Sequence, residues 1–139
     1  MARFKFRLER LLEYRRLQEQ WAKDAYAEVV SRKNQVEHEV ELLQKKVKFA
    51  ATSRPCAVDE RISLNNYFER LDDEIRGQQV LVSMLAEEAE TALSKWHEAR
   101  KDAEAIDKLR EADLAEWTLE ETRREQSELD EWAVLRRAA

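Results

Sequence analysis

The sequence contains almost no glycine or proline: among its 139 residues, Gly77 and Pro55 are the single examples. Turns and strand connections depend largely on these two residue types. A meander of strands or a bundle of many short helices would lack the residues that form its turns. A glycine-rich phosphate-binding loop is excluded as well. The sequence therefore favours a few long elements within a single domain, residues 1–139.

Cysteine and long apolar runs are scarce as well. Cys56 is the single cysteine, so an internal disulfide is excluded and a reducing compartment such as the cytosol is expected. No apolar run approaches the roughly 18 to 20 residues that cross a bilayer, and the N-terminus lacks the continuous apolar core of a signal peptide. We therefore expect a soluble protein without direct membrane insertion, whose contact with a membrane is indirect.

Charged residues are abundant instead, at 40% of the chain, and the formal net charge is −5. A composition dominated by Ala, Glu, Leu, Arg and Lys is typical of long helices and coiled coils. The negative balance argues against a nucleic-acid partner, because counterion release needs a basic face. The charge is uneven, however: residues 1–16 carry six basic side chains against two acidic ones, and residues 111–131 carry nine acidic against two basic.

The pattern that organises the chain is an apolar stripe in its second half. Apolar residues recur there in alternating steps of four and three residues, which predicts a helix over residues 59–137 whose narrow seam needs another helix to cover it. The seam positions are Leu64, Phe68, Leu71, Ile75, Gln78, Val82, Leu85, Ala89, Ala92, Trp96, Ala99, Ala103 and Ile106.

The first half follows the same rule and predicts a helix over about residues 5–50. Residues 1–6 alternate as a strand would, but they are too few for a sheet. Three polar residues interrupt the seam, which weakens a coiled coil but can fix its register. The seam positions are Leu8, Leu12, Arg15, Glu19, Ala22, Tyr26, Val29, Lys33, Val36, Val40, Leu43, Val47 and Ala50.

Between these helices, residues 51–58 break the pattern and form the expected turn. Pro55 cannot sit inside a helix without loss of a backbone hydrogen bond, and it also disfavours the helical conformation at Arg54. Asp59 is the predicted N-cap of the second helix, and Glu60 suits the dipole of its first turn. We expect the chain to reverse its direction here.

The predicted fold is therefore all-α, an antiparallel coiled-coil hairpin of two long helices in which the second is longer. A reversal centred on Pro55 places Leu8 opposite the region of Asp102. The first helix then covers the second only as far as about residue 105, and about 30 residues of the second helix extend beyond that point. No part of the chain is expected to cover the large apolar side chains of this overhang, which are Leu114, Trp117, Leu119, Leu129, Trp132 and Val134.

Catalytic and metal-binding patterns are missing. Neither His38 nor His97 has the Glu-x-x-His spacing of carboxylate-bridged metal sites, so both are expected to be surface residues. The acidic run at residues 72–74 lacks the alternate spacing of a calcium loop. A two-helix hairpin also offers no enclosed pocket. We expect no enzyme activity, no metal and no cofactor.

Gly77 and Tyr67 each allow two interpretations. Gly77 in the second helix is either a tolerated defect or a point of bending or close approach. Tyr67 lies one step from the seam and forms an apolar shoulder near the turn, where it either packs within the hairpin or contacts a partner.

Three motifs resemble the flagellar export protein FliJ family. The first is Phe4-x-Phe6-x-Leu8-x-x-Leu11-Leu12-x-Tyr14-Arg15, and the second is Tyr67-x-x-x-Leu71-x-x-x-Ile75-x-x-Gln78. The third is Glu125-Gln126-x-x-Leu129-Asp130-Glu131-x-Ala133-x-x-Arg136. Their order along nearly the full chain is more specific than any one of them.

The resemblance implies a non-enzymatic, stalk-like adaptor of the bacterial flagellar type III export apparatus. Its partners would be the hexameric flagellar export ATPase, the cytoplasmic part of the export gate membrane protein, and export chaperones. It would be a monomer when free, located in the cytoplasm and peripherally associated with the inner membrane at the flagellar base.

The resemblance also implies two binding surfaces. The paired ends of the helices would insert into the ATPase ring, through Leu8, Leu12, Tyr14, Arg15, Trp117, Gln126, Leu129, Asp130, Glu131 and Trp132. The stretch near the turn would contact the gate through Tyr67, Leu71, Glu74 and Gln78.

Three alternatives remain open. The equivalent stalk protein of a virulence type III secretion system shares the hairpin, and gene neighbourhood would separate it. A cytoskeletal coiled-coil tether would dimerise through its seams, whereas a hairpin would sediment as an elongated monomer. A nucleic-acid-binding protein is supported by the basic first 16 residues alone.

Overall fold

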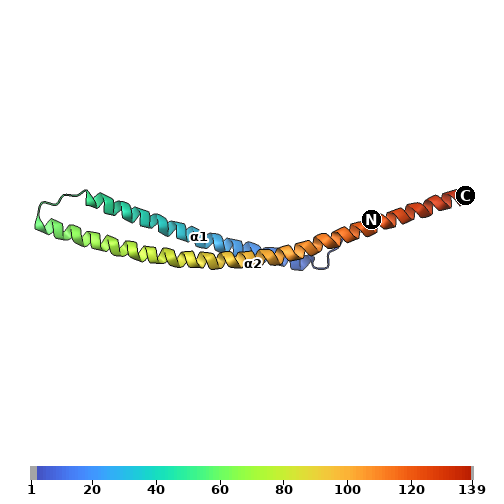
Figure 1. Ribbon diagram of the computed structural model, residues 1–139, viewed down its shortest axis with the longest axis horizontal. Coiled ribbons are helices and arrows are strands. Elements are labelled where there is room, and N and C mark those ends of the chain that lie inside the picture. The colour runs from blue at the N-terminus through green and yellow to red at the C-terminus, as the bar shows by residue number, and fades with distance from the viewer. Residues whose placement is uncertain (1–2, 139) are drawn as a thin grey trace. The chain divides into compact units, whose positions relative to one another are not determined.

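A computed structural model of the chain describes residues 3–138 and shows two helices in that range, α1 (Glu9–Ala51) and α2 (Val58–Ala138) (Figure 1). Helix α1 has 43 residues and α2 has 81. The two helices pack against each other and the second is longer, which confirms the predicted fold class. The chain divides into two compact units, which are described separately.

The hairpin unit comprises Trp21–Trp96: most of α1, the connection, and the first half of α2. Here the predicted seams are confirmed, because every seam position from Ala22 to Ala50 and from Leu64 to Trp96 is buried or half-buried. The best-covered side chains, each at most 9% exposed, are Val40, Ala50, Leu71, Leu85 and Ala89. Burial of this apolar stripe is what stabilises helices that would be marginal alone.

The connection between the helices differs in detail from the prediction. Helix α2 begins at Val58, so Asp59 lies in its first turn and is not the N-cap. The backbone N–H of Cys56 donates a hydrogen bond to the Glu60 carboxylate over 3.2 Å. Glu60 thus reaches back toward the start of the helix, as the second residue of a capping box does, and the Ala57 carbonyl accepts a hydrogen bond from the Arg61 N–H over 3.2 Å.

The terminal unit comprises the residues up to Gln20 together with those from His97 onward. Its core is formed by Phe6, Leu12 and Ile106, and Leu12 is completely buried. Phe4 and Leu8 pack against this cluster. Residues 3–8 precede α1 and supply three of these side chains, so the alternating lead-in is part of the core.

The predicted register is wrong in this unit. Asp102 was expected opposite Leu8, but it pairs with Arg15 at 3.5 Å. Glu9, the neighbour of Leu8, instead pairs with Arg110 at 2.9 Å. The shift is about one heptad, and a shift of that size keeps every apolar position facing the partner helix. The apolar pattern alone therefore cannot distinguish the two registers.

The overhang is consequently shorter than predicted. The rings of Phe4 and Trp117 lie 5.8 Å apart, and both Leu114 and Trp117 are half-buried. The expectation that nothing covers these two residues is wrong, because the register shift and the lead-in extend the pairing. From residue 122 to residue 138 every side chain is exposed. In Figure 1 this orange-to-red end of α2 has no other helix beside it.

Candidate partner-binding surfaces

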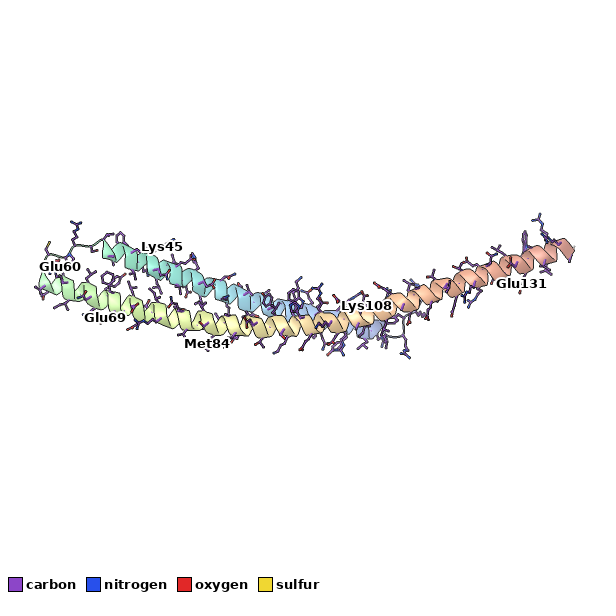
Figure 2. The ribbon with its side chains drawn as sticks, in the orientation of Figure 1. Lys45, Glu60, Glu69, Met84, Lys108 and Glu131 are labelled. Carbon is purple, nitrogen blue, oxygen red and sulfur yellow. The ribbon has the colours of Figure 1, made fainter. Side chains whose placement is uncertain are left out.

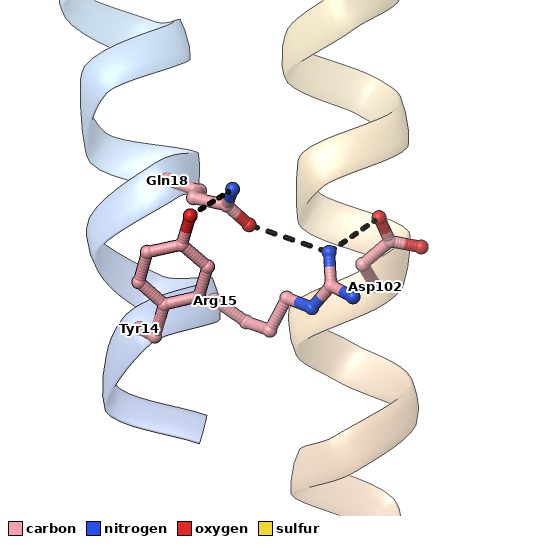
Figure 3. Close-up of polar contacts among 4 residues, drawn as sticks. All are labelled: Tyr14, Arg15, Gln18 and Asp102. Carbon is pink, nitrogen blue, oxygen red and sulfur yellow. Dashed lines mark hydrogen bonds and ion pairs between the residues drawn. The ribbon is translucent and has the colours of Figure 1, made fainter. Parts of the chain in front are cut away.

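One residue predicted to bind the ATPase, Arg15, instead takes part in the ion pairs that join α1 to α2 in the terminal unit. Arg15 Nη1 donates to Gln18 Oε1 over 3.3 Å and pairs with Asp102 on α2, and Gln18 Nε2 donates to the Tyr14 hydroxyl over 3.1 Å (Figure 3). Arg15 thus acts within the chain, while Tyr14 remains 50% exposed. A second interhelical pair joins Arg16 to Asp107 at 2.9 Å.

The other residues predicted to bind the ATPase fall into two groups. Leu8, Leu12 and Trp117 belong to the packed part of the terminal unit, and Leu12 has no exposed surface. These three residues stabilise the packing of the terminal unit and do not form an exposed binding surface. Gln126, Leu129, Asp130, Glu131 and Trp132 lie together on the uncovered stretch of α2.

This uncovered stretch, residues 122–138, is called the free end of α2. It exposes 61% of Leu129 and 59% of Trp132, and the Arg136 guanidinium lies 5.1 Å above the Trp132 ring. Gln126 Nε2 donates to Asp130 Oδ1 over 3.3 Å. Figure 2 shows Glu131 on this stretch of α2, with no other helix beside it. Leu135, which the sequence analysis did not single out, is 70% exposed three residues after Trp132.

A second surface lies beside the turn in the hairpin unit. Tyr67 is 37% exposed and Glu74 is exposed, whereas Leu71 is buried in the seam at 5%. Gln78 is half-buried, and its Oε1 has no hydrogen-bond partner among the described residues. The residues predicted to face the gate therefore split between the outer surface and the seam.

Tyr67 lines a groove that also contains residues of α1. Two of these are large and exposed, Leu42 at 44% and Phe49 at 79%. Neither was predicted as a site residue. The sequence did contain a signal for both, because the heptad pattern places these large apolar residues outside the seam. The groove is lined by Leu42, Lys45, Lys46, Phe49, Ala50, Ser53, Leu64 and Tyr67.

Candidate metal ligands do not cluster within the described part of the chain. That range holds no cluster of three or more His, Cys, Asp or Glu residues arranged to bind a metal ion. His38 and His97 are both exposed, as predicted, and so is Cys56. None of the described helices is long and apolar enough to cross a membrane.

Comparison with protein families matches residues 4–138 to the model described as "Flagellar FliJ protein". The chain belongs to the FliJ family. The match includes the lead-in, both helices and the free end of α2, so the family covers each surface described above. Searches of curated proteins and of solved structures gave no match.

Membership in the FliJ family makes the protein a component of the flagellar export apparatus, and the family is non-catalytic. The helical coiled-coil hairpin fits this membership. The flagellar description also favours the flagellar apparatus over the virulence type III system that the sequence left open.

Proposed function

We propose that this FliJ-family protein is a stalk-like adaptor that binds the ring of the flagellar export ATPase and links it to the export gate. The observation that carries the proposal is the free end of α2. All of its side chains are exposed, and they include four large apolar residues, Leu129, Trp132, Val134 and Leu135.

A partner that buries these apolar side chains would stabilise the free end of α2. Its 17 residues would extend about 25 Å at the usual rise of an α-helix. Apolar side chains scattered singly on a surface are normal, but a group of them on one unpaired helix typically marks an interaction site. The interior of a ring would cover this helix from all sides. Trp132 is the expected anchor, because tryptophan is enriched among the residues that dominate binding energy.

The start of α1 would contribute the second part of this contact. Tyr14 is exposed, and the Gln18 amide holds its hydroxyl. Leu8, Leu12, Arg15 and Trp117 would act indirectly, because they fix α1 on α2. Substitution of Tyr14 should thus weaken ATPase binding without loss of helix, whereas substitution of Leu12 should also loosen the terminal unit.

The gate protein would bind the hairpin unit beside the turn. Tyr67 and Glu74 are exposed there, on α2. Leu71 would pack the two helices together beneath this surface, where Gln78 is half-buried. Export chaperones are the third proposed partner. The protein would act in the cytoplasm as a monomer when free, at the flagellar base.

Pulldown with the cognate export ATPase tests the proposal. Trp132→Ala should lower ATPase binding strongly, since removal of an anchor residue typically costs 2 kcal/mol or more, which is about 30-fold. Val80→Ala is the matched control, because Val80 is similarly exposed, at 61%, but belongs to the hairpin unit. Circular dichroism should show unchanged helix content in both variants. Equal ATPase binding by the parent and Trp132→Ala would count against the proposal.

A further inference from the structure

We infer that the turn end of the hairpin unit, residues 42–70, binds an anionic lipid surface directly. This goes beyond the proposed function, in which the membrane is reached through the gate protein. The inference rests on unpaired basic side chains and exposed apolar side chains that the chain places around one turn.

The turn end is basic although the chain as a whole is acidic. Residues 42–70 carry six basic side chains against three acidic ones. The basic set is Lys45, Lys46, Lys48, Arg54, Arg61 and Arg70, and all of these are exposed. None of them takes part in the ion pairs found among residues 3–138. Of the acidic three, Glu60 is engaged by the backbone N–H of Cys56.

The basic side chains near the start of the chain differ from this cluster. In the terminal unit Arg15 and Arg16 pair with aspartates on α2. The same unit contains the acid-rich residues 111–131, and its acidic side chains outnumber its basic ones. Four other basic residues in this unit, Arg3, Lys5, Arg7 and Arg10, are exposed and take part in none of the ion pairs found among residues 3–138. Their unit nevertheless has an excess of acidic side chains, whereas residues 42–70 have an excess of basic ones.

Exposed apolar side chains accompany the basic cluster. Phe49 is 79% exposed, Val58 72% and Ile62 54%. Clusters of four to eight Lys or Arg residues attract anionic lipid headgroups, and neighbouring apolar side chains add binding by entering the interface. Figure 2 places Lys45 and Glu60 on the two sides of the turn. The cluster thus surrounds the end where α1 gives way to α2.

This distribution favours an extended surface over a single peptide. The groove beside the turn contains Lys45, Lys46 and Phe49. Val58 and Ile62 do not line it, and neither do Arg54 and Arg61. A peptide in the groove would leave those four side chains in water. A broad anionic surface that meets the turn end-on can engage both groups.

Vesicle co-sedimentation of the full chain tests the inference. The parent protein should bind vesicles of mixed phosphatidylglycerol and phosphatidylcholine, fail to bind pure phosphatidylcholine, and dissociate as salt is raised. Lys45→Glu with Lys46→Glu should lower binding by about tenfold or more, since each basic residue near the surface contributes severalfold. Phe49→Ala should lower binding to the anionic vesicles but leave the salt dependence of that binding unchanged. Lys101→Glu with Lys108→Glu, on exposed lysines of the terminal unit, is the matched control and should leave binding unchanged.

Several outcomes would overturn the inference: no binding to the anionic vesicles, equal binding to neutral vesicles, or an equal loss in the control variant. Retention on a poly-glutamate matrix without vesicle binding would also overturn it and indicate an acidic protein partner. The ATPase and the gate protein are absent from this assay. Failure here therefore leaves the proposed function standing, and failure of ATPase binding leaves this inference standing.

Discussion

Replacement of Leu12 by alanine should open the terminal unit while the hairpin unit stays closed. Leu12 is completely buried, and it forms the core of the terminal unit together with Phe6 and Ile106. A buried Leu→Ala change costs about 2 to 5 kcal/mol, depending on how far the site can collapse. The cluster around Leu12 is small, and Phe4 and Leu8, which pack against it, are only partly buried, so the site can collapse in part. We expect about 2 to 3 kcal/mol.

Amide hydrogen exchange measures this loss locally, because each 1.4 kcal/mol of opening free energy changes the exchange rate about tenfold. In Leu12→Ala, amides of residues 9–20 and 97–117 should exchange about 30- to 140-fold faster at the stated cost. Amides of the hairpin unit should keep their protection, because its seams are untouched. The matched control is Leu17→Ala, on the same helix and in the same unit but 46% exposed, with an expected cost within about 0.5 kcal/mol.

Two results would refute this reasoning. If Leu12→Ala and Leu17→Ala exchanged alike, Leu12 would not be the centre of a core. If protection fell equally along the whole chain, the two units would open together and the local account of stability would be wrong.

Three further predictions concern stability. Gly77→Ala should raise the free energy of unfolding by about 0.5 to 1 kcal/mol in thermal melts, because a Cβ at Gly77 meets nothing within 4 Å; a lower Tm would contradict this. Gln78→Leu should raise the midpoint of urea unfolding by removing a buried Oε1 that has no partner, worth about 1 kcal/mol or more; an unchanged midpoint would argue that the oxygen is already satisfied. A double-mutant cycle on Arg16 and Asp107 should give less than about 1 kcal/mol, falling with salt, because both side chains are about half-exposed; a larger, salt-independent coupling would contradict this.

The seams could be predicted from the sequence because a helix of regular period repeats its apolar face. Every position picked by steps of four and three proved buried or half-buried, including the polar Lys33 and Gln78. The end of α1 followed from Pro55 and the polar residues around it. This part of the fold depends on local spacing alone.

The register could not be predicted in the same way. A slide of one heptad leaves the apolar stripes in contact, so the choice depends on individual pairs such as Glu9 with Arg110. The lead-in was a further obstacle: the alternation of Phe4 and Phe6 did not indicate that they would pack on Trp117 and Ile106. These long-range contacts decide where the free end of α2 begins.

The candidate site was predictable where it lies on a single helix. Leu129 and Trp132 were predicted to be uncovered because the first helix is too short to reach them, and both are exposed. Near the turn, by contrast, the motif mixed the buried Leu71 with the exposed Tyr67. Phe49 was missed because the motif on α2 carried no information about α1.

The central claim is that the free end of α2 is the part that the export ATPase binds. The most direct test compares the full chain with a chain truncated after Glu121, which keeps the Phe4–Trp117 contact and all interhelical ion pairs described above. Circular dichroism and sedimentation should show a folded monomer in both cases, and titration with the cognate ATPase should show binding by the full chain alone. Equal affinity of the two chains for the ATPase would contradict the account.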